Sequence, residues 1–135
     1  MASISQRLFS VTIFGYRKPG MDEDAYHNYV SQTHAGHLKD LLVKNKIVSY
    51  HMQHNSTKAR ALMDRILPDI PVEKVEDADC IVQIVFRDIE DYVNVKNEEQ
   101  FKSVVNPDHA VFSDPTKTKF VTGWFEFHIA DGKIV

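Results

Sequence analysis

Apolar and polar residues alternate along four stretches of the chain, and this pattern predicts four β-strands. A two-residue period is typical of a strand that buries one face. The expected strands span residues 8–16, 47–54, 78–88 and 119–129, and the third is the most strongly patterned. It contains Cys80, the only cysteine, which we interpret as an ordinary core residue. No disulfide within the chain is therefore expected.

Two longer stretches between the strands have a helical period. The first begins at Asp22 or Asp24, either of which can cap a helix, and runs to about Lys44. At 100° per residue, one face of this helix carries Tyr26, Val30, Thr33, His34, His37 and Leu41. Its histidines are thus expected to point mainly inward. The second helix is predicted at residues 90–105 and is interrupted by Pro107, which leaves residues 108–113 as a short turn or a helical cap.

A shorter helix is expected at residues 57–67, where Pro68 and Pro71 follow. The surrounding segment, residues 56–76, could form a lid or a dimer arm, and its sequence does not choose between them. Near the C-terminus, Asp131 and Gly132 predict a turn.

The order of these elements is β-α-β-(short α)-β-α-β, which predicts an α+β, ferredoxin-like split βαβ fold of one domain over residues 1–135. In this fold a four-stranded antiparallel sheet has helices on one face only. The uncovered face would carry either Phe120, Thr122 and Trp124 or Val121, Phe125 and Phe127, depending on register. Because either set is bulky and apolar, we expect a homodimer with its sheets packed face to face.

Composition narrows the classes of function. The chain is 43% hydrophobic and 26% charged, with a formal net charge of -3 and no basic stripe, so nucleic acid is not an expected partner. No apolar run approaches the roughly 20 residues that span a bilayer, and the N-terminus lacks the apolar core of a signal peptide. A soluble cytoplasmic protein without membrane contact is expected.

Seven histidines are the main chemical signal, because imidazole changes protonation near neutral pH. His34 is the first candidate for acid/base catalysis, and His37, one turn later, would share its cavity or orient it. Tyr26 could donate a hydrogen bond to a substrate oxygen. Each also has a purely structural interpretation: a core histidine, a solvated one, or a packing aromatic.

Two further residues, His109 and Asp114, lie five positions apart after Pro107. The Asp could orient the imidazole and fix its tautomer, or it could simply cap a turn.

Neither a metal nor a cofactor is expected. His34 and His37 could share a metal, but no carboxylate completes such a site and no HExxH motif is present. His51 and His54 are three residues apart in a strand, so at most one can face a cavity under the helices. The glycines at positions 15, 20, 36, 123 and 132 form neither a GxGxxG nor a P-loop motif, which argues against NAD, FAD and ATP.

Several short motifs together resemble the EthD family of dimeric α/β-barrel proteins, and its fungal polyketide-cluster branch in particular. They are the segment at residues 16–21, Tyr26-His27, Thr33-His34-Ala35, Asp108-His109, Phe112, Asp114 and Gly123-Trp124-Phe125. The resemblance covers nearly the whole chain and is least specific at residues 56–76. Gly36-His37 departs from the common pattern of a proline and an apolar residue, and it adds an imidazole.

The resemblance implies a cofactor-free lyase that tailors aromatic polyketides. The nearest type is a decarboxylase of an atrochrysone-carboxylic-acid-like intermediate on the way to anthrones and emodin, with His34, His109, Tyr26 and Asp114 in catalysis. The expected substrate contacts are His37, His51, Phe86, Phe112 and Trp124. Alternatives are a dehydratase or cyclase, then a cofactor-free anthrone monooxygenase, then a non-catalytic binder of an aromatic intermediate.

Overall fold

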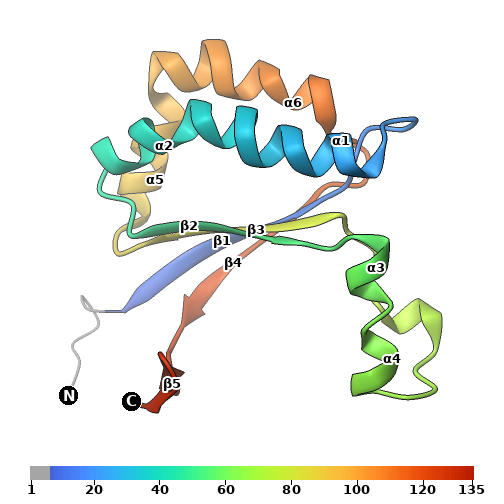
Figure 1. The fold of residues 1–135 in the computed structure, drawn as a ribbon. Coiled ribbons are helices and arrows are strands. Elements are labelled where there is room, and N and C mark those ends of the chain that lie inside the picture. The colour runs from blue at the N-terminus through green and yellow to red at the C-terminus, as the bar shows by residue number, and fades with distance from the viewer. Residues whose placement is uncertain (1–6) are drawn as a thin grey trace.

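The structure, a computed structural model, describes residues 7–135 and has helices layered on one face of an antiparallel sheet (Figure 1). The sheet has four strands in the order β2-β3-β1-β4. Their bounds are β1 Leu8–Gly15, β2 Ser49–His54, β3 Cys80–Phe86 and β4 Lys119–Phe125. The predicted ferredoxin-like α+β fold is confirmed.

Two long helical segments form the covering layer. The first consists of α1 Glu23–Asn28, the π-helical segment η2 Tyr29–His34 and α2 Ala35–Lys44, which follow one another without a break. Asp22 caps it by accepting a hydrogen bond from the backbone N–H of Ala25. The second segment consists of α5 Ile89–Asn97, η4 Phe101–Val105 and α6 Asn106–Phe112. Their shared interface contains the core residues Leu38, Leu41, Leu42, Val95, Phe101 and Val105.

The π-helical segment η2 changes which side chains of the first helix face the sheet. Its backbone bonds run from residue i+5 to residue i, as from the Ala35 N–H to the Val30 carbonyl, so the turn holds more residues than an α turn. Tyr26, Val30 and His34 are buried at a spacing of four, as is Leu38 after them. Thr33 was expected on this face but is exposed, because the wider turn rotates it outward.

The second helical segment does not end at Pro107, contrary to the expectation from sequence. The helix breaks instead at Glu98, whose backbone is extended, and it resumes at Glu99 and continues to Phe112. Pro107 follows the π-helical segment η4, in which the Asn106 N–H bonds the Phe101 carbonyl five residues back. We attribute the tolerance of Pro107 to this looser bonding pattern. Consequently residues 108 and 109 lie on a helix and not in a turn.

Strand register decides which side chains lie under the helices. Ile13 of β1 pairs with Val82 of β3 and with Phe120 of β4, and Met52 of β2 also pairs with Val82. Paired residues share a face, so these four side chains lie on the helix side. Of the two sets weighed for the uncovered face, Val121 and Phe125 therefore lie there, and Phe120 does not.

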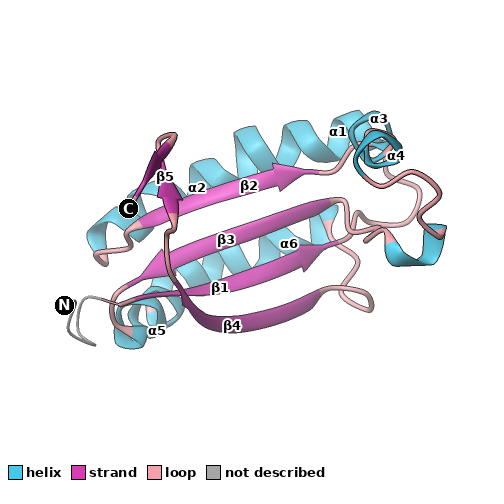
Figure 2. Ribbon diagram, turned by 90° about the horizontal axis from the view of Figure 1, so that it is seen from below, coloured by secondary structure: helices cyan, strands magenta, loops and turns pink. Residues whose placement is uncertain are grey.

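Figure 2 shows the sheet from its uncovered side. Polar side chains form a row across three strands on this face. His51 Nε2–H donates to Gln83 Oε1 at 2.8 Å, and the Gln83 amide lies 3.3 Å from Ser10 Oγ and 3.4 Å from Thr12 Oγ1. His51, expected to contact substrate, is thus directed away from the helix-side cavity. The alternation of the strand instead places His54 on the helix side.

Two projections extend from the sheet on its uncovered side (Figure 1). One contains the short helices α3 Thr57–Arg60, α4 Met63–Ile66 and η3 Val72–Lys74, where one helix was predicted. The other is a hairpin of β5 Ile129–Ala130 and β6 Lys133–Ile134. Asp131 and Gly132 form its turn with positive φ, as predicted. Within residues 7–135, no helix is long and apolar enough to cross a membrane.

Candidate active site

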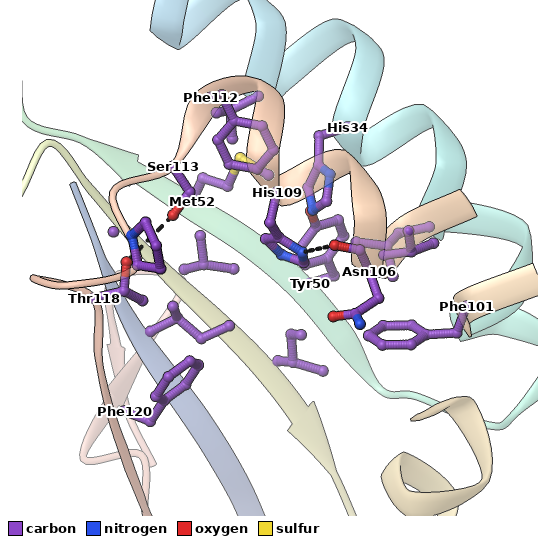
Figure 3. A pocket seen from close by; sticks show the side chains of 18 of the residues that line it. His34, Tyr50, Met52, Phe101, Asn106, His109, Phe112, Ser113, Thr118 and Phe120 are labelled. Atoms are coloured by element: carbon purple, nitrogen blue, oxygen red, sulfur yellow. Dashed lines mark hydrogen bonds between the residues drawn. The ribbon is translucent and has the colours of Figure 1, made fainter. Parts of the chain in front are cut away.

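A cavity of about 290 Å³ lies between the sheet and the helices. Its walls are mostly apolar, which suits a flat aromatic ligand. The helices contribute Tyr26, Val30, His34, Leu38, Phe101, Asn106, His109 and Phe112, and the sheet contributes Ile13, Tyr50, Met52, Val82, Ile84 and Phe120. Figure 3 shows His34 and His109 next to each other on the helix side of the cavity.

His34 is held by a buried carboxylate. Its Nδ1 lies 2.8 Å from Asp108 Oδ2, and the two side chains are only 7% and 9% exposed. The other oxygen of Asp108 accepts a hydrogen bond of 2.5 Å from the Tyr29 hydroxyl. Because an ionised carboxylate only accepts hydrogen bonds, the Nδ1 of His34 carries the proton. The neutral imidazole therefore has its lone pair on Nε2.

The charges of this pair follow from burial and hydrogen bonding. Burial lowers the pKa of His34 below its usual value, with a further contribution from His109, although Asp108 opposes the shift. Burial would raise the pKa of Asp108, but the hydrogen bonds from Tyr29 and His34 outweigh it and hold that pKa low. At neutral pH the pair is a carboxylate beside a neutral imidazole, so His34 is set up to accept a proton.

His109 has a similar arrangement. Its Nδ1 lies 3.0 Å from the backbone carbonyl of Asn106, which can only accept, so Nδ1 again carries the proton and Nε2 is the free nitrogen. The His109 ring packs edge-on against His34, with centroids 4.7 Å apart, and both rings contact Phe112. Two imidazoles with fixed tautomers thus border the same cavity.

Tyr26 is a third polar group on the cavity wall. The residue is buried, and burial raises the pKa of its hydroxyl, so this group stays a hydrogen-bond donor. A Cβ atom at Gly15 would lie 3.1 Å from the Tyr26 hydroxyl oxygen. The absence of a side chain at Gly15 therefore leaves the space that this hydroxyl occupies.

The structure corrects the expected role of Asp114. Its carboxylate accepts hydrogen bonds from the Thr116 backbone N–H at 3.0 Å and from the Thr116 hydroxyl at 2.7 Å, so it caps a turn. The carboxylate that contacts an imidazole is Asp108, and its partner is His34. Sequence reasoning missed this pair because it placed Asp108 in a short turn or helical cap after Pro107, and not within a continuing helix.

Of four residues expected to contact substrate, one lines the cavity and three do not. Phe112 lines the cavity, whereas Phe86 is buried and stacks on Tyr92 at 5.9 Å outside the lining. Trp124 is half-exposed on β4, with the Arg7 guanidinium 4.2 Å from its ring centroid. His37 is half-buried and also lies outside the lining, although it is close enough to act electrostatically on His34 and Asp108.

Sequence reasoning did not select Tyr29, because an α-helical wheel turns this residue off the inward face. In the structure Tyr29 opens the π-helical segment η2, and its hydroxyl donates a hydrogen bond to Asp108. Across residues 7–135, no group of three or more His, Cys, Asp and Glu side chains is placed to hold a metal ion.

The lowered pKa of His34 predicts that the protein loses stability as the pH falls below neutrality. In the unfolded chain the pKa of His34 is about 6.5, which is above its pKa in the folded protein. Between these two pKa values the unfolded chain therefore binds more protons than the folded protein. The contribution is fully present above about pH 6.5 and is lost as the pH falls from there through the folded pKa. Urea unfolding between pH 7.5 and 5 measures the slope.

His54, whose pKa burial also lowers, contributes in the same direction. The control is therefore His34→Asn, which should reduce the slope without abolishing it. An unchanged slope in this variant would contradict the assignment to His34.

A family model and curated relatives point to the same protein family. The EthD domain model matches residues 18–116. A Metarhizium robertsii protein, "Conidial pigment biosynthesis dehydratase EthD", is 41% identical over 96% of this chain and 91% of its own. "Decarboxylase claH" of Passalora fulva is 36% identical over 96% of this chain and 83% of its own.

A solved structure shows the same fold at low identity. It is a dimeric protein of unknown function and ferredoxin-like fold from Bacteroides fragilis. The likeness has a TM-score of 0.57 at 10% identity and covers 87% of this chain and 96% of that one.

Proposed function

Because this chain belongs to the EthD family, we propose that it is a lyase that tailors aromatic polyketides, and specifically that it decarboxylates an atrochrysone-carboxylic-acid-like β-keto acid without a cofactor. The observation that carries the proposal is the buried His34–Asp108 pair beside an apolar cavity. A fixed imidazole that is neutral at pH 7 is suited to accept a proton and later return it.

The proposed reaction starts with Nε2 of His34 taking the proton of the substrate's carboxyl group. The bond between the carboxyl carbon and the ring carbon then breaks, its electron pair forms an enolate on the adjacent ketone, and carbon dioxide leaves. Tyr26 donates a hydrogen bond to the enolate oxygen, where charge develops. The His34 imidazolium, which faces the Asp108 carboxylate through Nδ1–H, then protonates the ring carbon and regenerates the enzyme.

Dehydration is the second candidate, and the 41% identical relative named as a dehydratase favours it. Here His34 would remove a proton next to a ketone, and the departing hydroxyl group would leave as water after taking a proton from a second group. His109, with its ring 4.7 Å from His34, is the proposed donor, which requires it to enter the cycle protonated. The same pocket therefore serves either elimination, and the substrate's leaving group decides the product.

The decisive experiment incubates the purified protein with atrochrysone carboxylic acid and follows product mass and released carbon dioxide against the spontaneous reaction. Catalysed loss of carbon dioxide supports the decarboxylase. Loss of water alone would replace it by the dehydratase or cyclase, and gain of oxygen by a monooxygenase. Binding without any acceleration would leave a carrier of the aromatic intermediate and refute the lyase.

We also propose that the protein is a homodimer in which two uncovered sheet faces pack together. Val121 and Phe125 lie on that face, and the fold relative from Bacteroides fragilis is described as dimeric. Sedimentation equilibrium should give twice the chain mass. A monomer at micromolar concentration would contradict this assembly and leave the reaction test unaffected.

A further inference from the structure

Lys96 is a cationic side chain that borders the cavity and comes from a different helix, α5, than His34 and His109. Among the residues from 7 to 135 that line the cavity, Lys96 is the only Lys or Arg. It lies on α5, one turn after Tyr92, which also lines the cavity. A single cationic group beside mostly apolar walls favours a ligand that carries a negative charge at that point.

The ammonium group of Lys96 lies against the cavity wall. Its Nζ is 4.5 Å from the centroid of the Phe101 ring, and Phe101 is itself a buried lining residue. Within the described part of the chain, no Asp or Glu forms an ion pair with Lys96. The residue is exposed at the cavity rim, yet partial burial of the ammonium lowers its pKa. The charge is thus incompletely hydrated and is not neutralised by a carboxylate.

Asn106 provides a polar group on the same side of the cavity. Its backbone carbonyl is used by His109, but its side-chain amide points toward Phe101 in Figure 3. An amide can donate to an anionic oxygen next to a cation. Lys96 thus lies over the Phe101 ring, and the Asn106 amide points toward that ring in Figure 3.

We infer that Lys96 and Asn106 form a binding site for a phenolate or enolate oxygen on a planar aromatic ligand whose reacting ring lies at His34 and His109. This inference rests on the proposed function, and it specifies the substrate as one with an acidic ring oxygen remote from the group that leaves. Phe101 would pack against the ring that bears this oxygen.

The positive charge of Lys96 is better suited to bind a ring oxygen that does not react than to bind the carboxylate that leaves. A cation bound to the departing carboxylate would stabilise the bound substrate more than the transition state, because the negative charge of the carboxylate moves into the ring in the transition state. A spectator phenolate keeps its charge throughout, so its contact with Lys96 adds affinity and orientation without opposing the reaction. Charge-assisted hydrogen bonds in a partly dry site are among the stronger ones.

The test measures binding of unreactive naphthalenes at pH 7 by calorimetry, so it does not depend on turnover. The probes are 2,4-dinitro-1-naphthol, which is a phenolate at this pH, 2-naphthoate, and neutral 2-naphthol. Lys96→Met keeps the alkyl stem and removes the charge, and Lys96→Arg restores a charge. The matched control is Lys102→Met, an exposed lysine on η4 outside the cavity lining.

Lys96→Met should weaken binding of the dinitronaphtholate roughly tenfold or more, the usual size for loss of a charge-assisted hydrogen bond. Binding of 2-naphthol should change by less than about twofold, Lys96→Arg should recover most of the loss, and Lys102→Met should resemble wild type. Equal loss for charged and neutral probes, or no loss for any probe, overturns the site. Loss confined to 2-naphthoate overturns the phenolate assignment, because the site would then select a carboxylate.

Discussion

His34→Asn is expected to lower turnover of an aromatic β-keto acid by about 10²–10⁴-fold, the usual contribution of a general acid/base group. Asparagine places an N–H near the position of Nδ1 and can still donate to Asp108, which would otherwise lose a buried hydrogen bond. It has no group at the position of Nε2, the atom proposed to carry the proton. Steady-state kinetics by carbon dioxide release measures the effect.

Two comparisons separate this loss from misfolding. Binding of 2-naphthol should stay within a few-fold of wild type, because the apolar walls are unchanged. His128→Gln is the matched control, since His128 is an exposed side chain after β4 whose partner is Glu126. If His34→Asn retained near wild-type turnover while His109→Asn did not, the proton transfer would belong to His109 and the proposed role of His34 would be wrong.

Asp108→Asn is expected to lower the same turnover by roughly 10²-fold or more. The substituted amide can still accept from His34 and donate to the Tyr29 oxygen, so the geometry survives while the negative charge is lost. The carboxylate raises the pKa of His34 against the effect of burial. Its removal lowers that pKa further, which weakens the base and destabilises the imidazolium that forms during the reaction.

The pH profile distinguishes a positioning role for Asp108 from a purely structural one. In the wild type, kcat/KM should rise with pH through the lowered pKa of His34, and in Asp108→Asn this limb should move to lower pH as the plateau falls. Tyr29→Phe is the matched variant, because it removes the other partner of Asp108 but leaves the carboxylate on His34. Its turnover should change by less than about tenfold. If kcat/KM of Asp108→Asn fell equally at every pH and its rising limb did not shift, the loss would be structural and the electrostatic role of Asp108 would be refuted.

Each region that sequence reasoning placed incorrectly depends on information from outside its own segment. Asp114 was paired with His109 because Pro107 was expected to end the helix, yet η4 and α6 continue through the proline and bring Asp108 to His34. His51 was expected in the cavity, but a strand faces one way or the other according to its pairing with β3. A shift of one residue would reverse this choice.

The order of helices and strands, and with it the ferredoxin-like fold, could be predicted from the sequence because hydrophobic periodicity is a local property of each segment. The sequence also placed His34 and Tyr26 on the inward face of the first helix, since an amphipathic helix buries its apolar stripe whatever its partner. The carboxylate that contacts His34, the strand faces that line the cavity and the position of Lys96 could be identified only once the chain was folded. These depend on strand register, on two π-helical turns and on contacts between segments some 70 residues apart, such as His34 with Asp108, and no local pattern encodes them.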